Sequence, residues 1–222
     1  YKTLPLKNKK IVITAGPTHE AIDPVRFIGN NSSGKMGFEL AKRAADLGAE
    51  VILISGPTNL SIKHVNIKLE QVVTADQMFE SSKKHYVDAS VFIASAAVAD
   101  FKPDSNATQK IKKGTGFDQI NLLPTPDILA YLGKIKKDQF LVGFALETEN
   151  ELENAKGKLE SKNLDAIVLN SLNDEQAGFG GNQNKITYLQ PNVNPISFEL
   201  KTKQEVAVDV FDQILLKYEK LS

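Results

Sequence analysis

The sequence predicts a doubly wound α/β fold, in which helices cover both faces of a mostly parallel sheet. Short apolar runs rich in β-branched residues recur along the chain and alternate with segments of helical period. Such runs, bounded by turn residues, are typical of strands buried on both faces of a parallel sheet. Their alternation with helices favours parallel pairing. At 222 residues the chain is long enough for one sizeable α/β domain, and we expect a single domain spanning 1–222.

The first strand, helix and strand can be placed by their end signals. Ile11–Thr14 is a β-branched apolar run followed by a turn, which predicts a buried strand. Ser33 can N-cap the helix that follows, and Gly48 stands where a left-handed C-cap is wanted. Val51–Ser55 is the next buried strand, which completes one βαβ unit. The apolar face of the helix consists of Met36, Leu40, Ala44 and Leu47.

The rest of the chain continues this alternation. Thr74 can cap a helix at 75–84, and Pro126 stands in the first turn of another helix. Further strands are expected at 65–72, 91–94, 120–123, 140–145 and 164–169, with a helix at 151–161. Segments 185–189 and 196–200 look like an antiparallel pair, followed by an amphipathic helix at 203–218. The prediction is therefore a Rossmann-like sheet, mostly parallel, with a short antiparallel addition near the C-terminus.

Composition excludes several classes of function. Lys plus Arg and Asp plus Glu both number 27, so there is no general basic field and we expect no nucleic-acid partner. The absence of cysteine excludes disulfides, thiolate zinc sites and a cysteine nucleophile. The three histidines, at 19, 64 and 85, show no metal-ligand spacing and are expected at the surface. No apolar run approaches the ~20 residues of a membrane span, and no signal peptide is visible, so a cytoplasmic protein without a membrane partner is expected.

The connection after the first strand is long and polar. It runs from Gly16 to about Ser33, whereas a dinucleotide-binding fold has a tight glycine turn at this place. Loops longer than ~12 residues in a compact domain are usually functional or disordered. This one carries Arg26 and Asn30 and leads through Ser33 and Lys35 into a helix N-terminus, which favours anions. A phosphate or carboxylate site is favoured over a solvated loop with an ordinary serine cap.

Other candidate residues follow the expected parallel strands, where such sheets bind ligands. They lie in Ser95–Asp100 and Gly143–Ala145, and Lys158 and Lys162 share one helical face. Each has a plain structural alternative: the small residues could serve close packing, and the lysines could form a solvated face. The polar segment 101–117 contains a proline, two glycines and Lys110-Ile-Lys-Lys113, and is expected to be a mobile flap.

Several segments carry a specific family resemblance. At the start of the chain these are Ile13-Thr-Ala-Gly-Pro-Thr18, Ile22-Asp-Pro-Val-Arg-Phe-Ile28 and Asn31-Ser-Ser-Gly-Lys-Met-Gly37. Later ones are Ala96-Ala-Val-Ala-Asp100, Lys110-Ile-Lys-Lys113, Pro126-Asp-Ile128, Gly143-Phe-Ala-Leu-Glu-Thr148, Asn163-Leu-Asp165 and Gly178-Phe179. Together they closely resemble phosphopantothenoylcysteine synthetase, also called phosphopantothenate–cysteine ligase, from Lys10 to about Leu189. Two positions depart from the family pattern: His19 replaces an arginine, which puts a role for that position in doubt, and Leu146 replaces an alanine.

The resemblance implies a ligase of coenzyme A synthesis. Such an enzyme activates the carboxylate of 4′-phosphopantothenate with a nucleoside triphosphate, CTP in bacteria, to form an acyl-cytidylate and pyrophosphate. The amine of L-cysteine then attacks and releases CMP. Mg²⁺ is expected with the triphosphate, and the Lys-Ile-Lys-Lys segment favours the CTP-dependent type. The resemblance also implies a homodimer. In many bacteria the synthetase is fused behind a flavin-dependent decarboxylase, for which this chain has no room, so a stand-alone enzyme without flavin is expected.

The resemblance also assigns residues. Those matched to phosphopantothenate and its acyl group are Arg26, Asn30, Ala96 and Ala97, to which the loop adds Ser33 and Lys35. Those assigned to the nucleotide are Gly16, Ala94, Ser95, Ala96, Asp100, Lys110, Pro126, Asp127, Ile128, Leu129, Phe144, Lys158 and Lys162. Asn30 and Lys110 are the catalytic candidates, and no Mg²⁺ ligand is assigned.

The chemistry agrees with these residue types. Attack of a carboxylate on an α-phosphate needs the charge on the leaving pyrophosphate to be neutralised, which Mg²⁺ and lysines such as Lys110 can do. The Asn30 amide can donate a hydrogen bond to the acyl oxygen, which becomes an oxyanion when the amine attacks. Backbone groups around Phe144 and Ala145 could read the N4 and O2 atoms of cytosine without a charged side chain.

Two alternatives remain. A nicotinamide-dependent reductase needs a tight glycine loop and an acidic residue at the end of the second strand, where this chain has Ser55-Gly56. A non-catalytic nucleotide-binding domain would bind the nucleotide but release no pyrophosphate.

Overall fold

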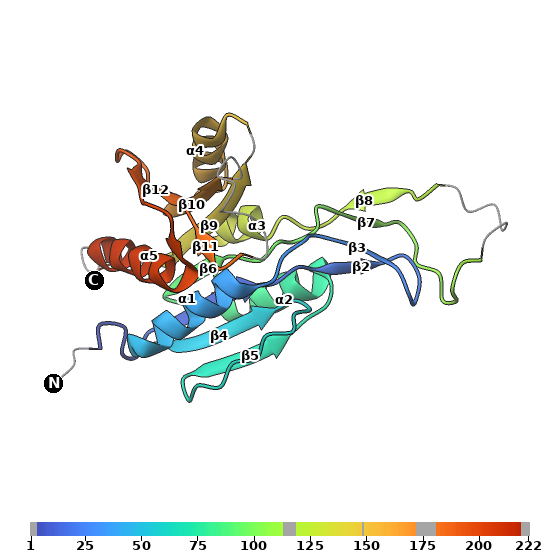
Figure 1. Cartoon of the computed structure of the whole chain (residues 1–222), viewed down its shortest axis with the longest axis horizontal. Coiled ribbons are helices and arrows are strands. Elements are labelled where there is room, and N and C mark those ends of the chain that lie inside the picture. The colour runs from blue at the N-terminus through green and yellow to red at the C-terminus, as the bar shows by residue number, and fades with distance from the viewer. Residues whose placement is uncertain (1–3, 113–118, 148, 172–180, 219–222) are drawn as a thin grey trace.

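The computed structural model describes residues 4–112, 119–147, 149–171 and 181–218, and its centre is an eight-stranded sheet (Figure 1). The strand order is β13-β12-β10-β9-β6-β1-β4-β5. Six of these strands are parallel: β1 (Lys10–Ala15), β4 (Glu50–Ser55), β5 (Ile67–Gln71), β6 (Val91–Ala94), β9 (Phe140–Glu147) and β10 (Ala166–Ser171). The predicted doubly wound, mostly parallel sheet is therefore confirmed.

Helices cover both faces of this sheet. On one face lie α1 (Lys35–Asp46) and α5 (Lys203–Tyr218), and on the other α2 (Ala75–Tyr86), α3 (Ile128–Ile135) and α4 (Glu151–Ser161). In β1, Ile11 and Ile13 pack with α1 and α5, whereas Val12 packs toward α2. Lys10, at the start of β1, is only partly buried, but from Ile11 onward both faces of the strand are buried, and its side chains there are all apolar or small.

The antiparallel addition near the C-terminus is also confirmed. Strand β12 (Ile186–Leu189) pairs antiparallel with β10, and the short edge strand β13 (Ile196–Ser197) pairs antiparallel with β12. A separate two-stranded ribbon joins β11 (Gln183–Asn184) to β14 (Lys201–Thr202). This ribbon brings the start of α5 back to the carboxyl end of the parallel strands. Of the loop predicted at 178–181, residues 178–180 lie outside the part of the chain that the structure describes.

The long connection after β1 is not the irregular loop that the sequence suggested. It contains an antiparallel hairpin of β2 (His19–Ala21) and β3 (Phe27–Gly29). Asp23 closes the turn, because its buried carboxylate accepts from the backbone N–H groups of Val25 and Arg26, at 2.8 and 2.9 Å. These local hydrogen bonds organise the polar turn without any apolar alternation, so the strand pattern was hidden.

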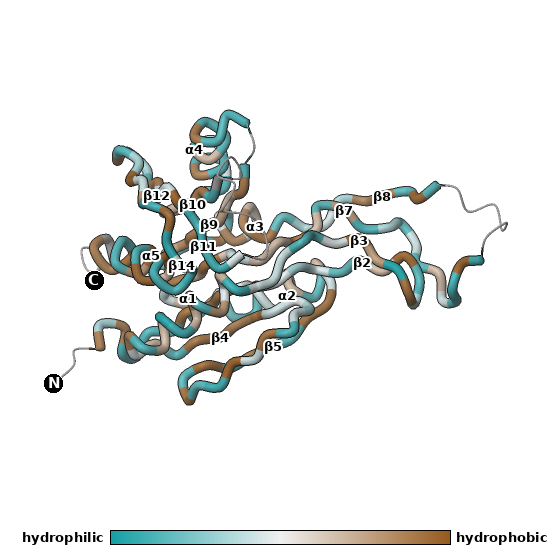
Figure 2. The backbone as a smooth tube through the Cα atoms, viewed as in Figure 1, coloured by the Kyte–Doolittle hydropathy of each residue, from teal (hydrophilic) through white to brown (hydrophobic). Residues whose placement is uncertain are grey.

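A second antiparallel pair lies beside this hairpin. It joins β7 (Phe101–Pro103) to β8 (Leu122–Pro124), within the segment predicted as a flap, of which residues 113–117 lie outside the described part. The backbone N–H of Ala107 donates to the Ile22 carbonyl at 2.9 Å, which joins the two pairs. We call strands β2, β3, β7 and β8 the arm. The arm projects away from the central sheet in Figure 1, and Figure 2 shows β8 as an apolar segment far from the core.

Three local predictions were wrong. The N-cap of α1 is Gly34, not Ser33, and Pro126 precedes the N-cap of α3, which is Asp127, so it lies outside the first turn. The histidines are not simply at the surface. His85 is buried with its ring nitrogen 2.8 Å from the Glu70 carboxylate, and the His19 ring stacks on Phe27 at 3.7 Å. No helix within the described residues is long and apolar enough to cross a membrane.

Candidate functional site

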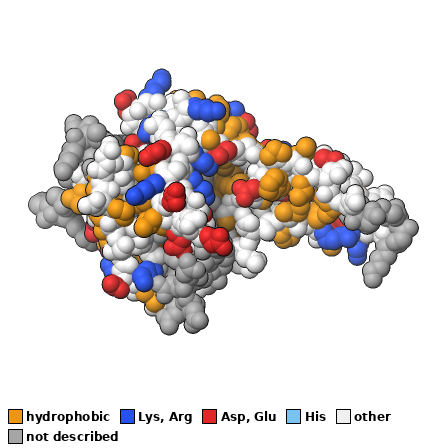
Figure 3. All heavy atoms as spheres, turned by 90° about the horizontal axis from the view of Figure 1, so that it is seen from above, with side chains coloured by type: hydrophobic (Ala, Val, Ile, Leu, Met, Phe, Trp, Pro, Cys, Tyr) orange, Lys and Arg blue, Asp and Glu red, His pale blue; other side chains and the backbone are white. Residues whose placement is uncertain are grey.

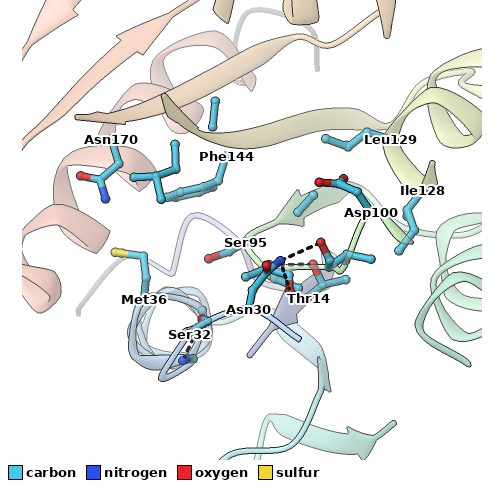
Figure 4. A pocket seen from close by; sticks show the side chains of 18 of the residues that line it. Thr14, Asn30, Ser32, Met36, Ser95, Asp100, Ile128, Leu129, Phe144 and Asn170 are labelled. Carbon is cyan, nitrogen blue, oxygen red and sulfur yellow. Dashed lines mark hydrogen bonds between the residues drawn. The ribbon is translucent and has the colours of Figure 1, made fainter. Parts of the chain in front are cut away.

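A pocket of about 600 Å³ opens at the carboxyl ends of the parallel strands (Figure 4). It lies where β1 has β4 on one side and β6 on the other, so that the connections leave in opposite directions. Open α/β sheets bind ligands at such a switch point. The side chains around it come from the segments after β1 and β6, from the starts of α1 and α3, and from β9, β10, β11 and α5.

The segments that follow β1 and β6 are tied together by threonine side chains. The Thr14 hydroxyl accepts from the Ala96 N–H at 3.2 Å, and the Thr18 hydroxyl accepts from the Ala99 N–H at 2.9 Å. Between them, the Ala97 N–H donates to the Gly16 carbonyl at 2.9 Å. These bonds fix the small-residue segment after β6 as a rigid floor of the pocket. Its alanines leave room for a ligand to approach the backbone.

Asn30 braces this floor from the end of the hairpin. Its Nδ2 donates to the carbonyls of Ala97 and Val98, at 3.3 and 3.0 Å, and Figure 4 shows the side chain pointing into the middle of the site. Both amide hydrogens are therefore engaged with the protein. Donation to an acyl oxygen would require one of these bonds to be exchanged.

The start of α1 forms a second wall that presents backbone N–H groups. Gly34 takes a left-handed conformation, with φ of 76°, and no side chain caps the helix. The Gly34 N–H donates to the Ser32 hydroxyl at 3.3 Å, and the first helical turn, from Lys35 to Gly37, lines the pocket. Such a turn attracts anions through its N–H groups and the helix dipole.

An ion pair closes the opposite wall. Asp127 caps α3 by accepting from the Ala130 N–H at 2.9 Å, and its other oxygen lies 2.8 Å from the Lys162 ammonium. Burial alone would raise the pKa of Asp127, but the Lys162 ammonium and the Ala130 amide together hold it below its usual value. Asp127 is therefore an anion at neutral pH and orients the Lys162 side chain along the pocket.

Most of the predicted site residues are brought together here. Those that line the pocket are Asn30, Ser33, Lys35, Ala94, Ser95, Ala96, Ala97, Asp100, Pro126, Asp127, Ile128, Leu129, Phe144 and Lys162. Gly16, Arg26, Lys110 and Lys158 do not line it. Gly16 lies behind the lining, with its backbone against Gly34, and the Lys158 ammonium binds Glu147 at 2.6 Å.

Arg26 and the segment of Lys110 lie together on the arm. The Arg26 guanidinium pairs with Asp23 and donates to the Ile111 carbonyl at 2.8 Å, while the Ile111 N–H donates to the Asp23 carboxylate at 3.2 Å. Both backbone groups of Ile111 are thus held, which fixes the position of its neighbour Lys110. Burial would raise the pKa of Asp23, but these N–H groups and the guanidinium bring it far below its usual range.

Comparison with known proteins places the chain in a family. A family model described as "DNA/pantothenate metabolism flavoprotein C-terminal domain" matches residues 6–217. The chain belongs to this family. A similar solved structure is the C-terminal domain of the coenzyme A biosynthesis bifunctional protein CoaBC, with a TM-score of 0.83 and 42% identity, covering 97% of this chain and 98% of that one. It has the same Rossmann-like architecture, which confirms the predicted fold.

Full-length relatives are longer than this chain. A protein of an unknown prokaryotic organism named "Cysteine/Cysteine sulfinic acid decarboxylase" is 52% identical over 212 residues, which are 95% of this chain and 59% of that protein. The coenzyme A biosynthesis bifunctional protein CoaBC of Bacillus subtilis is 43% identical over 210 residues, which are 95% of this chain and 52% of that protein. The chain thus spans 52% to 59% of the length of these two curated relatives.

The sequence did not predict all of the residues that line the pocket. The residues to which it gave no role in the site include Thr14, Met36, Thr125, Asn170, Asn184 and Lys203. Thr14 and Met36 lie within motifs that carry the family resemblance and could have been found there. Asn184 and Lys203 come from the β11–β14 ribbon and α5, which reach the pocket only through the fold, so no local pattern marked them.

Proposed function

We propose that this domain joins 4′-phosphopantothenate to L-cysteine, using CTP. The observation that carries the proposal is the pocket itself, which combines a rigid alanine floor, the backbone N–H groups of the first turn of α1, and lysines on two walls. These are the features needed to hold a carboxylate against a nucleotide phosphate. The relatives named above support it, since their names place them in coenzyme A biosynthesis.

The first step would form the acyl-cytidylate. A carboxylate oxygen of phosphopantothenate attacks the α-phosphorus of CTP, the bond to the β-phosphate oxygen breaks, and pyrophosphate leaves. The chain must hold two anions close together, and the α1 amides and Lys162 supply positive potential for this. Within the described residues no group of three acidic or histidine side chains could hold a metal ion. We therefore propose that Mg²⁺ enters as the CTP complex, bound by phosphate oxygens.

The second step would form the amide. The neutral cysteine nitrogen attacks the acyl carbon, the bond to the cytidylate oxygen breaks, CMP leaves with that electron pair, and the nitrogen gives up one proton to solvent. Asn30 holds the carbonyls of Ala97 and Val98, and one of its amide hydrogens can turn to the acyl oxygen as negative charge develops on it. Asn30 is thus proposed both to brace the floor and to stabilise this transition state.

Lys110 and Arg26 would act from the arm. Neither lines the pocket, but both belong to a unit that is rigidly tied through Asp23 and Ile111. We propose that this unit serves an active site completed on binding or by a second copy of the chain. Apolar side chains gather on the arm in Figure 3, and Val25, Phe27, Phe101, Ile120, Leu122 and Leu123 are all more than a third exposed.

This exposed patch favours a homodimer that meets through the arm. The alternative interface, the edge of the sheet at β13, is only two residues long and offers little pairing surface. An apolar patch of aromatic and aliphatic side chains is the usual mark of an interface. Light scattering after gel filtration tests it, and a monomeric mass across micromolar concentrations would oppose it.

A pyrophosphate assay tests the function. The protein is mixed with MgCTP, phosphopantothenate and cysteine, omitting each in turn, and with MgATP in place of MgCTP. We expect pyrophosphate release that requires phosphopantothenate, amide product that also requires cysteine, and higher rates with CTP. Nucleotide binding without pyrophosphate release would instead indicate a binding domain. Release of CO₂ from cysteine would instead favour the activity named for the decarboxylase relative.

Two further points concern the reductase alternative and the expected absence of flavin. A reductase is disfavoured, because the end of β4 carries Ser55, whose hydroxyl donates to the Gly56 carbonyl, in place of an acidic residue for a ribose. The expectation of a flavin-free, stand-alone enzyme stays a prediction. It is checked by the absence of flavin absorbance in protein purified from its native host and by ligase activity of this chain alone.

A further inference from the structure

Lys203 is a buried cation in an unfavourable place. It is the first residue of α5, lines the pocket and is only 8% exposed. Its backbone N–H donates to the Asn182 carbonyl at 2.9 Å, which fixes the helix start. Its ammonium, by contrast, makes no hydrogen bond or ion pair with any residue that the structure describes. Lysine is almost never buried unless it is paired.

Two neighbours increase the cost of this charge. Lys35, on the facing helix α1, lies close enough to repel it, and burial together with this repulsion lowers the pKa of Lys203. The Lys35 ammonium itself is held by the Asn182 side chain at 2.8 Å. Lys203 also stands at the positive end of the α5 dipole, where a cation is disfavoured. Burial, a like charge and a helix dipole all oppose Lys203, and a bound anion would relieve all three.

Unpaired polar atoms at the same end of the pocket indicate a ligand independently. The Oδ1 atoms of Asn170 and Asn184 are buried without a hydrogen-bond partner among the described residues, and both side chains line the pocket. Figure 4 places Asn170 and Met36 across the pocket from Asp100 and Ile128. Such oxygens can accept from ligand hydroxyls or from water bound to a phosphate-held Mg²⁺.

We propose that Lys203, Lys35 and the first-turn amides of α1 form a subsite for a terminal phosphate of the ligand. The inference rests on the proposed function for the identity of that ligand. Two sources share this chemistry: the β- and γ-phosphates of CTP and the 4′-phosphate of phosphopantothenate. The carboxylate Asp127 is paired with Lys162 on the opposite wall and does not compete for Lys203.

Calorimetric titration separates the two sources. Wild type and Lys203→Met are titrated with CTP and CMP, with phosphopantothenate and pantothenate, and with tripolyphosphate alone. Loss of one charged hydrogen-bond donor should weaken the ligand bearing the phosphate about tenfold to a hundredfold. Its partner without that phosphate should change less than about twofold. A selective loss for CTP assigns the nucleotide tail, and a selective loss for phosphopantothenate assigns the 4′-phosphate; either supports the subsite.

Two variants and a melting temperature provide controls. Lys203→Arg should keep most of the affinity. Lys201→Met removes a charge from the adjoining strand, where the ammonium pairs with Asp209 at 2.7 Å, and should leave the selectivity intact. Lys203→Met should melt no lower than wild type, since it removes a desolvated cation. If it fails to fold, Lys203→Gln takes its place in the same titrations.

The outcomes separate this inference from the proposed function. Equal affinity of Lys203→Met and wild type for every phosphate ligand overturns the subsite, and so does an equal loss for CMP and CTP with a lowered melting temperature. Tripolyphosphate binding that depends on Lys203, with no binding of CTP or phosphopantothenate, keeps the subsite but overturns the proposed function. Normal ligase turnover, with equal affinities of Lys203→Met and wild type for every phosphate ligand, keeps the proposed function but overturns the subsite.

Discussion

Gly37 lies where α1 touches β1, and replacing it with alanine tests whether this close approach positions the site. An added Cβ would lie 2.5 Å from the Ala15 Cβ and 3.1 Å from the Thr14 carbonyl oxygen. Ordinary carbon contacts are about 3.5–4.0 Å, so the helix start must move by about 1 Å. Because β1 is central and both its faces are buried, the strand cannot yield, and α1 must shift.

The expected cost follows from two opposing terms. Overpacking a core typically costs about 1–3 kcal/mol, and alanine regains about 0.5–1 kcal/mol over glycine in a helix. The net loss should be about 1–2 kcal/mol, or roughly 2–8 °C in melting temperature for a chain of this size. A 1 Å displacement of the α1 amides should also lower kcat/KM about a hundredfold, a far larger effect than the loss of stability explains.

Gly157 provides a matched control. It is an exposed glycine within α4, and an added Cβ meets nothing within 4 Å. Gly157→Ala should therefore raise the free energy of unfolding by about 0.5–1 kcal/mol and leave activity unchanged. Urea unfolding and the pyrophosphate assay are run on both variants. Wild-type activity in Gly37→Ala, or equal stability changes in the two variants, would refute the argument that this contact sets the geometry of the site.

Four further predictions concern the pocket and the arm. Lys110→Ala should slow acyl-cytidylate formation in a single turnover, and an unchanged rate would remove Lys110 from that step. Asn30→Asp should let the acyl-cytidylate accumulate before cysteine attack, as seen by mass spectrometry of quenched samples; equal slowing of both half-reactions would leave only a bracing role. Leu122→Glu, on the exposed face of the arm, should lower the solution mass to that of a monomer without lowering the melting temperature of dilute protein. The lowered pKa of Asp127 means that its stabilising contribution is present above the pKa of the unfolded chain and is lost as pH falls toward the folded value, so Asp127→Asn should flatten this acid limb of stability.

The sequence determined the central sheet because a strand that is buried on both faces needs apolar residues at consecutive positions. Ile11–Thr14 and Val51–Ser55 are continuous apolar runs since neither face of these strands meets water. Helix ends can also be marked locally, because a capping side chain binds the backbone of its own helix. The Thr74 cap was predicted and is present, with its hydroxyl accepting from the Gln77 N–H at 3.2 Å. Motifs of small and charged residues then marked most of the pocket lining, because they follow strands whose direction was already known.

The sequence predicted a strand at 120–123, which overlaps β8, but only the tertiary structure decided the rest of the arm and the far wall of the pocket. Three-residue strands such as β2 and β7 are too short for a period to show, and the turn between β2 and β3 is organised by hydrogen bonds that the Asp23 carboxylate accepts. Lys203 was read as one polar residue of an amphipathic helix. It became a pocket residue because the β11–β14 ribbon returns the chain to the ends of the parallel strands. Local sequence records what each segment buries, but which distant segments meet depends on how the sheet is wound.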